Sequence, residues 1–313
     1  MKNAKTKNTP YRHQRGNTAM TLTLNTTLTP TLNAAPKLTS LAWLAPLAAL
    51  LLPGLAQAAD TPPAGAAPTV TDPHFKLAPG YLAPASLPLR LALLGAPPAD
   101  GSAALARDEE AHHAAMSLKG SAREKLAASD AELEFPAPAK TFACAIGTDI
   151  SEKTTPHLYT LMQRVLSDAG GSTYAGKNAW NRTRPFVVHG EGTCQPSMEP
   201  LLRTDGSWPS GHSAAGWAWG LILAEVQPER ATEVLARGLA FGQSRVICNA
   251  HWQSDVDAGR LMGAATVATL QGNKDFIADL AAAKREVAAA AQHGIKPGQD
   301  CAAERVALSL TQH

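Results

Sequence analysis

The stretch Pro156-His-Leu-Tyr-Thr-Leu-Met-Gln-Arg-Val-Leu-Ser-Asp-Ala169 decides the fold class, because its apolar residues recur at intervals of three and four. This period places them on one face of an α-helix, whereas a half-buried strand would alternate every second residue. Thr155 suits the N-cap, Pro156 suits the first helical position, and Gly170-Gly171 suits a left-handed C-cap. The stretch therefore predicts an amphipathic helix that packs on a core.

The sequence downstream has the same helical character. Apolar periodicity predicts four further helices, separated by Pro or Gly: Ser213–Val226, Glu229–Phe241, Ser254–Leu270 and Lys274–Gln292. Runs that alternate like a β-strand are nearly absent, and no strong linker interrupts the chain after residue 101. We therefore predict an all-α fold in which residues 102–313 form one helical domain.

The composition of the 313-residue chain is that of a folded protein. Hydrophobic residues make up 45% of it and charged residues 17%, which argues against a wholly disordered chain. Its 24 Gly and 23 Pro show no triplet period, which excludes a collagen-like chain. A multi-span membrane protein is not indicated either, because the apolar stretch Ala214–Ala224 is shorter than the about 20 residues that a helical span needs.

A second, N-terminal apolar stretch, Leu41–Leu55, is predicted to belong to a signal peptide. Basic residues and no acidic ones precede it, and the A-x-A sequence Ala56-Gln57-Ala58 follows it. We predict cleavage after Ala58 and export, so that residues 1–58 are the signal peptide. An uncleaved anchor is the alternative, and translation could start at Met1 or at Met20.

Removal of this leader changes the charge balance. It takes away six of the 28 basic residues and none of the 26 acidic ones, so acidic residues then outnumber basic ones by four. A nucleic-acid partner loses its support, because non-specific binding to a polyphosphate needs a surplus of Lys and Arg. Residues 59–101, rich in Pro and Ala, are predicted to be an N-terminal segment that packs on the later core without forming a domain.

Several common catalytic motifs are missing from the sequence. Neither H-E-x-x-H nor G-x-S-x-G occurs. Residues 171–177, Gly-Ser-Thr-Tyr-Ala-Gly-Lys, approach a nucleotide-binding P-loop, but Asn178 stands where a Ser or Thr would hold magnesium. The segment before them is also a predicted helix, whereas the P-loop follows a strand. We therefore discount this motif.

Three separated blocks carry the chemistry that remains. They are Lys177-x6-Arg184-Pro185, then Pro209-Ser210-Gly211-His212, then Ser244-Arg245-x5-His251-x3-Asp255. Each block alone has an ordinary explanation: a solvated basic face, a helix start with a capping serine, and a surface His–Asp pair. Together they are specific, because they supply every group that a phosphate site needs.

A phosphate dianion must lose its water, so its site has to supply cations and hydrogen-bond donors. Lys177, Arg184 and Arg245 provide three positive charges, two of them as guanidinium forks. Ser210 and Gly211 precede a predicted helix, whose first N–H groups and positive dipole end attract an anion.

Two histidines complete this predicted site. Asp255 follows His251 by four residues, which on a helix-like turn lets the carboxylate orient the imidazole and leave one ring nitrogen free to attack phosphorus. His212 in the first helical turn would protonate the leaving oxygen. A single histidine with a distant carboxylate does not make a coordination set, so we predict no metal and no other cofactor.

The chain resembles the bacterial class A non-specific acid phosphatases, within the superfamily of type 2 phosphatidic acid phosphatases and vanadium haloperoxidases. The blocks match the superfamily pattern K-x6-R-P, P-S-G-H, S-R-x5-H-x3-D at every position. Residues 206–213 resemble the class A signature, with Trp208 and Ser213 where that family usually has Tyr and Thr. These departures bear on substrate preference more than on activity. Three N-terminal stretches extend the similarity: Leu94–Pro98, Arg107–Glu110 and Leu118–Ser121.

The resemblance implies an all-α fold of the phosphatase and haloperoxidase type and broad, metal-free hydrolysis of small phosphomonoesters at acid pH. It makes His251 the nucleophile that forms a phosphohistidine, Asp255 its orienter and His212 the proton donor. The phosphoryl oxygens would be held by Lys177, Arg184, Ser210, Gly211 and Arg245. The resemblance also implies a homo-oligomer. From the predicted signal peptide we expect a periplasmic location and no membrane association after cleavage.

Other functions share part of this pattern. A vanadium-dependent haloperoxidase would use the same anion pocket, because vanadate mimics phosphate. A lipid phosphatase of the superfamily usually carries several membrane spans, which this sequence lacks. A secreted protein that binds phosphate without chemistry would leave one of the two histidines idle.

The four cysteines are Cys144, Cys194, Cys248 and Cys301, which allow three pairings. No C-x-x-C occurs, so a zinc ribbon or a thioredoxin-like site is not indicated. Cys194 and Cys248 flank the motif segments, and export favours oxidation. We therefore predict a disulfide between these two, with buried thiols as the alternative. The histidines without a partner pattern are expected to be surface or structural residues: His112, His113, His157 and His189.

Overall fold

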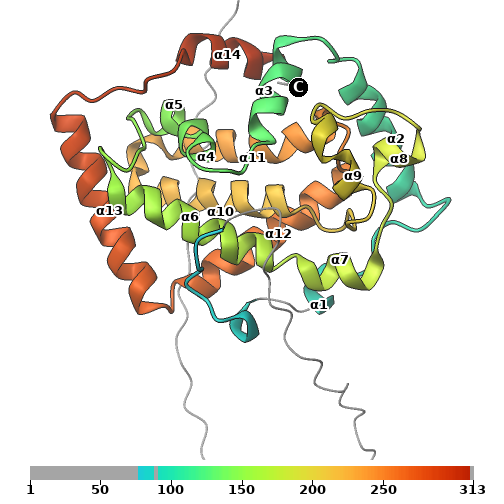
Figure 1. Ribbon diagram of the computed structural model, residues 1–313, viewed down its shortest axis with the longest axis horizontal. Helices are drawn as coiled ribbons and strands as arrows, with labels where there is room; N and C mark the ends of the chain where they lie inside the picture. Colours follow the sequence, from blue (N-terminus) through green and yellow to red (C-terminus); the bar gives the residue numbers. More distant parts are fainter. Residues whose placement is uncertain (1–76, 88–90, 311–313) are drawn as a thin grey trace, which may run out of the picture. The chain divides into compact units, whose positions relative to one another are not determined.

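The computed structural model describes residues 77–87 and 91–310, and every regular element in these ranges is a helix (Figure 1). The longer helices are α2 (Ala103–Met116), α3 (Ala122–Asp130), α6 (Pro156–Gly171), α10 (Gly211–Val226), α11 (Ala231–Ile247), α12 (Gln253–Leu270), α13 (Lys274–Gln292) and α14 (Cys301–Ser309). Short helical segments lie between them: η1 (Pro84–Ser86), α1 (Leu91–Leu94), α4 (Ala137–Thr141), α5 (Ala143–Ile146), α7 (Tyr174–Trp180), α8 (Pro185–Val188), η2 (Pro196–Met198), α9 (Glu199–Leu202) and η3 (Pro228–Arg230). The all-α prediction is confirmed.

The described residues begin at Leu77. The predicted signal peptide, residues 1–58, lies outside them. Within them, no helix combines the length and the apolar character that crossing a bilayer would require.

Helix α6 is the predicted amphipathic helix, but its predicted left-handed C-cap is wrong. Gly170 and Gly171 continue the helix, and neither has a positive φ. The hydroxyl of Ser172 donates to the carbonyl of Ala169, and the hydroxyl of Thr173 donates to that of Gly170, both at 2.7 Å. These side chains satisfy the last carbonyls of the helix, so a left-handed glycine is not needed.

Helix α11 differs most from its predicted bounds. It runs six residues beyond Phe241, to Ile247, although its last turns contain the polar sequence Gln243-Ser244-Arg245. Ser244 and Arg245 are nevertheless buried, so their polarity concealed that this part of the helix faces the interior. The extension places Ser244 and Arg245, the start of the third sequence block, at the end of a helix.

Helix α10 lies at the centre and packs most extensively against α11 and α12, with α6 also beside it (Figure 1). Close approach depends on glycines, because a Cβ on Gly259 would collide with the Ser210 carbonyl and one on Gly263 with the Ala214 carbonyl. The buried Trp219 donates from its indole N–H to the Met162 carbonyl at 2.9 Å, which joins α10 to α6. Because α11 reverses direction between α10 and α12, the starts of α10 and α12 and the end of α11 meet at one end.

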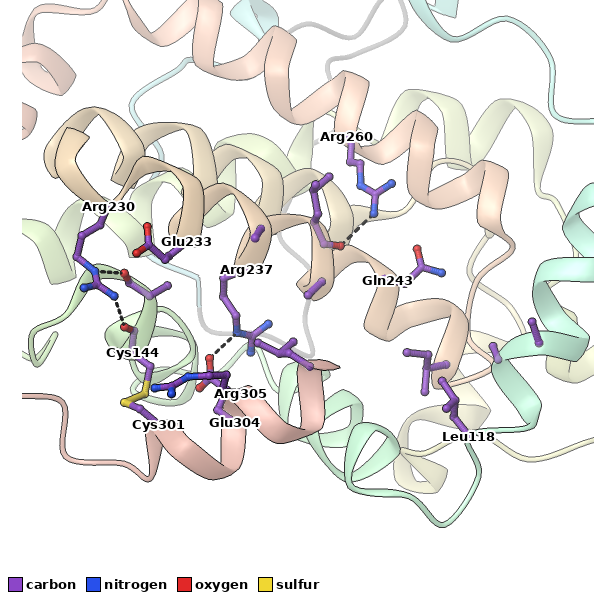
Figure 2. Close-up of a pocket in the computed structure, with 18 of the residues that line it drawn as sticks. Leu118, Cys144, Arg230, Glu233, Arg237, Gln243, Arg260, Cys301, Glu304 and Arg305 are labelled. Atoms are coloured by element: carbon purple, nitrogen blue, oxygen red, sulfur yellow. Dashed lines mark hydrogen bonds and ion pairs between the residues drawn. A yellow bond between two sulfur atoms is a disulfide. The ribbon is translucent and has the colours of Figure 1, made fainter. Parts of the chain in front are cut away.

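The C-terminal helix α14 is joined to the rest by two contacts that Figure 2 shows on the wall of a groove of about 820 Å³. Cys301 forms a disulfide with Cys144 of α5, and their Cα atoms lie 5.5 Å apart. One turn later, Glu304 accepts a hydrogen bond from Arg237 Nε of α11 at 3.1 Å. The disulfide therefore closes a loop across most of the helical region.

We expect the double variant Cys144→Ser/Cys301→Ser to lose about 2–5 kcal/mol of unfolding free energy, because the open chain gains the entropy that this long loop removes. Denaturant titration of the oxidised wild type and the variant measures the difference. The matched control compares wild type and variant under reductant, where both also lack Cys194–Cys248, and there the two should unfold alike. An unchanged unfolding midpoint in the variant would contradict the prediction.

Candidate active site

The three sequence blocks meet where the starts of α10 and α12 face the end of α11. Lys177 comes from α7, and Arg184 is the N-cap of α8. Arg184 Nη1 lies 2.9 Å from Nε2 of His251, which joins the first block to the third. The backbone N–H of Ser210 donates to the carbonyl of Asp255 at 3.0 Å, which joins the second block to the third.

His251 has a defined tautomer in this arrangement. The Arg184 guanidinium can only donate, so Nε2 of His251 accepts its hydrogen bond and carries the lone pair. Nδ1 therefore carries the proton, and it lies 3.3 Å from Oδ2 of Asp255 and 3.3 Å from the Ser207 hydroxyl. His251 precedes α12 instead of lying in it, so a tight turn brings it to Asp255.

Burial and the cations Arg184, Lys177 and Arg245 lower the pKa of His251 well below its ordinary value of 6.5. The site therefore favours the neutral imidazole, whose Nε2 lone pair accepts the Arg184 hydrogen bond. That is the ionisation state a nucleophilic histidine requires.

His212 lies in the first turn of α10, and its Nε2 is 3.0 Å from the carbonyl oxygen of Ala131. A carbonyl can only accept, so Nε2 carries a proton and Nδ1 is the nitrogen that gains or loses one. Burial and the charge of Arg245 lower the pKa of His212 well below 6.5, and His251 also contributes. Without an anion beside it, His212 is therefore neutral, and a bound phosphate would favour its protonation.

Lys177 and Arg184 share one carboxylate, which the sequence did not indicate. Oδ2 of Asp205 lies 2.7 Å from Lys177 Nζ and 2.8 Å from Arg184 Nη2. Burial and the neighbouring Arg184 lower the pKa of Lys177 to about 8, although Asp205 opposes them. Burial would raise the pKa of Asp205, but the two cations outweigh it and hold that pKa below its usual value.

Of the three cations predicted to bind phosphate, Arg245 is the one without an ion pair among the described residues. Its side chain is 1% exposed, and neither Nε nor Nη1 has a hydrogen-bond partner among the described residues. Burial and the charge of Arg184 lower its pKa to about 9, so it remains charged in neutral and acid solution. A buried guanidinium with unpaired donors is suited to bind an anion.

Ser210 is the N-cap of α10, and its Oγ accepts a hydrogen bond from the backbone N–H of Ser213 at 3.2 Å. Its own hydroxyl hydrogen is still available to a ligand oxygen. Gly211 is the first residue of α10, where backbone N–H groups have no partner within the helix. A Cβ there would make only ordinary contact with Thr173 Oγ1 at 3.5 Å, so the protein's own packing does not demand a glycine.

Comparison with known proteins fits this arrangement. Residues 158–274 match the model of the PAP2 superfamily. The chain is 44% identical to a non-specific acid phosphatase of Salmonella typhi, over 61% of this chain and 77% of that protein. It is 42% identical to a non-specific acid phosphatase of Providencia stuartii and 41% identical to an acid phosphatase of Zymomonas mobilis. These matches cover 63% of this chain, and 80% and 75% of the two relatives respectively.

The chain belongs to the class A acid phosphatases of the PAP2 superfamily. The superfamily match includes all three sequence blocks. Among the described residues, no group of three or more His, Cys, Asp or Glu side chains is arranged to hold a metal ion.

The family pattern missed four residues that contact its site. Asp205 holds Lys177 and Arg184, and Ser207 donates to Oδ2 of Asp255. Arg182 forms an ion pair with Oδ1 of Asp255 at 2.6 Å and another with Asp108 at 2.8 Å. Ser207 lies in the stretch that resembles the class A signature, and Arg182 lies two residues before Arg184, so their position next to the blocks was the available signal.

Both disulfides of this family member lie in the described region. Cys194 and Cys248 form the predicted pair, and their Cα atoms lie 4.8 Å apart. The backbone N–H of Cys194 also donates to the Cys248 carbonyl at 3.3 Å. The pair ties the loop after α8 to the end of α11, next to the third sequence block.

The histidines without a partner pattern in the sequence have other contacts or are exposed. His112 is buried and stacks on His189, with ring centroids 4.2 Å apart. His113 is exposed, and His157 forms an exposed ion pair with Asp279 at 3.7 Å.

Proposed function

We propose that this chain is an acid phosphatase that hydrolyses small phosphate monoesters with broad specificity through a phosphohistidine on His251. The observation that carries the proposal is the buried Arg245 guanidinium, with two nitrogens unpartnered, in a site that also holds two neutral imidazoles. Lys177, Arg184 and the start of α10 supply the other donors for the phosphoryl oxygens.

The first step forms a nitrogen–phosphorus bond. Nε2 of His251 attacks phosphorus, and the ester oxygen leaves with the electron pair of its bond to phosphorus. Nδ1–H of His212 protonates that oxygen, so an alcohol departs. Asp255 accepts the Nδ1–H of His251 and stabilises the positive charge that develops on the ring. The guanidinium groups of Arg184 and Arg245 stabilise the equatorial oxygens.

The second step reverses these roles. Nδ1 of His212 accepts a proton from water as the water oxygen attacks phosphorus. The nitrogen–phosphorus bond breaks, its electron pair returns to Nε2 of His251, and inorganic phosphate is released. No step in this scheme needs a metal ion.

The lowered pKa values predict an acid pH optimum. Catalysis needs neutral His251 and protonated His212, so the rate falls as the pH drops through the pKa of His251 and falls as it rises through that of His212. Because both lie below the usual 6.5 in the free enzyme, we expect kcat/KM to be greatest below about pH 6.5 and to decline above it. Bound phosphate raises the pKa of His212, so the alkaline decline of kcat should lie at higher pH than that of kcat/KM.

Two measurements check this prediction. His212→Asn should flatten the alkaline decline, since no proton is then lost from that position. An ester of a strongly acidic phenol, whose oxygen leaves without protonation, should show a weaker alkaline decline in the wild type. A kcat/KM that rises steadily to pH 8 or above would contradict the assignment of both histidines.

An assay of the purified chain on several phosphomonoesters, with and without a chelator, tests the proposed function. We expect multiple turnovers that the chelator leaves unchanged, with inorganic phosphate and vanadate as competitive inhibitors. Loss of activity in chelator would contradict metal-free catalysis. Capture of one phosphate per chain without turnover would indicate a binding protein, and oxidation of halide by peroxide with vanadate would indicate a haloperoxidase.

The proposal extends to location and assembly. We propose that residues 1–58 direct export to the periplasm and that residues 59–101 form a segment preceding the helical domain of residues 102–313. We also propose that the exported protein forms a homo-oligomer. Detection of a mature chain beginning at Ala59 in a periplasmic extract tests export, and light scattering tests the oligomer.

A further inference from the structure

Arg182 is a nearly buried cation beside the active site, at one of the six unspecified positions of the first sequence block. Its Nη1 lies 2.6 Å from Oδ1 of Asp255 and 2.8 Å from the Ser254 hydroxyl, and its Nη2 lies 2.8 Å from Oδ2 of Asp108. Its side chain is 10% exposed. The guanidinium carbon lies 5.9 and 5.3 Å from the ring centroids of Trp208 and Trp252.

The contacts of Asp255 divide between its two oxygens. Oδ2 accepts the backbone N–H of Trp252 at 2.9 Å and the hydroxyl of Ser207, and it faces Nδ1 of His251. Among the described residues, Oδ1 pairs with Arg182. Asp255 is 0% exposed, so water does not stabilise its negative charge. Arg182 supplies the compensating positive charge.

That charge matters for the state of His251. A fully buried carboxylate without a fixed cation would stabilise a proton on its neighbour, and the imidazole would become an imidazolium without a lone pair. The other cations whose charge acts on this ring are Arg184, Lys177 and Arg245, and Arg184 contacts it at Nε2. Arg182 is thus the cation that balances the charge of Asp255, through Oδ1, while His251 faces Oδ2.

Asp108 holds Arg182 in this position from α2. Its Oδ1 accepts the backbone N–H of Ser254 at 2.8 Å, and its Oδ2 accepts the Ser254 hydroxyl at 2.6 Å. Asp108 therefore binds both the start of α12 and the guanidinium that contacts Asp255. Its own charge opposes that of Arg182, so the two residues act on His251 with opposite sign.

We infer that Arg182 is a positioning residue for the phosphatase reaction: it balances the charge of Asp255 and keeps His251 a neutral, oriented nucleophile, while Asp108 anchors it. This inference deepens the proposed function and rests on it. It assigns Arg182 no contact with the substrate.

Kinetics of Arg182→Met, Arg182→Lys and Asp108→Asn test the inference with p-nitrophenyl phosphate. We expect Arg182→Met to lower kcat about 100-fold, as loss of a residue that orients a catalytic group does, with KM changed less than about threefold. The acid decline of kcat should move to higher pH in Arg182→Met, because His251 then gains a proton more easily. It should move to lower pH in Asp108→Asn, which removes a negative charge.

Arg182→Lys keeps the charge and should regain part of the lost kcat with the wild-type acid decline. Arg164→Met is the matched control, because Arg164 also has a carboxylate partner, Asp279 at 3.4 Å, and an aromatic ring, Tyr81 at 3.6 Å, away from the site. It should leave kcat and the pH profile unchanged. If Arg182→Met fails to fold, the acid decline still decides the question, because it should move to lower pH in Asp108→Asn and stay at the wild-type position in Arg182→Lys.

Two results would overturn the inference. An increase in KM at unchanged kcat would make Arg182 a substrate-binding group, and a lower kcat with the acid decline unmoved in every variant would make it merely structural. Failure of the proposed function is seen separately, because the wild type would then lack turnover or His251→Ala would retain it.

Discussion

His251→Ala is expected to lower kcat for p-nitrophenyl phosphate by about 10⁴-fold or more, because it removes the atom proposed to bond to phosphorus. Water, the alternative nucleophile, would have to attack phosphorus in place of the imidazole that Asp255 orients. The phosphate-binding cations stay in place, so binding of inorganic phosphate should persist. Initial rates and calorimetric phosphate titration measure the two quantities.

The control for this variant is His157→Ala, which removes an exposed imidazole and should keep wild-type turnover. The melting temperature of His251→Ala should show that the chain still folds. Rapid alkaline quenching of the wild type during turnover should reveal a phosphoryl group on His251. Near-wild-type turnover by His251→Ala would refute the assignment of the nucleophile.

Asp130→Ala is expected to lower the unfolding free energy by about 3–5 kcal/mol, because it leaves buried cations without their carboxylate. Asp130 is 0% exposed and forms an ion pair with Arg237, and its Oδ2 accepts the Ser244 hydroxyl at 2.6 Å. Arg123 is also buried there: burial lowers its pKa to about 10, and Asp130 opposes that decrease. Arg237 would then keep Glu304 as a carboxylate partner, whereas Arg123 would lose the negative charge of Asp130.

Denaturant unfolding at neutral pH measures the effect of Asp130→Ala. Asp257→Ala, which removes an exposed partner of Arg260, is the matched control and should cost no more than about 1 kcal/mol. The double variant Asp130→Ala/Arg237→Met should be more stable than the sum of the single changes predicts, because it removes a buried cation together with its partner. A loss below about 1 kcal/mol in Asp130→Ala would show that this cluster does not hold the helices together.

The ion pairs around Asp130 explain how the end of α11 can hold a buried charge. Arg245 lies next to Ser244, whose hydroxyl binds Asp130 on one side and accepts from Arg123 at 3.0 Å on the other. The cluster around Asp130 therefore fixes the last turn of α11 through Ser244. Nε and Nη1 of Arg245 can then stay without a partner among the described residues, since its backbone is held by neighbours that have their own counter-charges.

The bounds of the helices show how far local pattern reaches. Lys274–Gln292 was predicted with its observed limits, because its apolar period is uninterrupted and Asn273 caps it. The predicted end of α11, Phe241, lies before its true end, because Ser244 and Arg245 are polar and yet buried. Periodicity assumes that polar residues face water, and it fails where a functional site buries them.

The sequence by itself determined the chemistry: the residue types and spacings of the three blocks, with His212, Arg245, His251 and Asp255 among them, and the helical class that carries them. These features are local in the sequence, so they can be recognised without a structure. Only the tertiary structure decided that Asp108 reaches Arg182 across 74 positions and that Asp130 reaches Arg237 across 107. A charge in a single sequence carries no mark of its distant partner, and folding alone selects which cation balances which buried carboxylate.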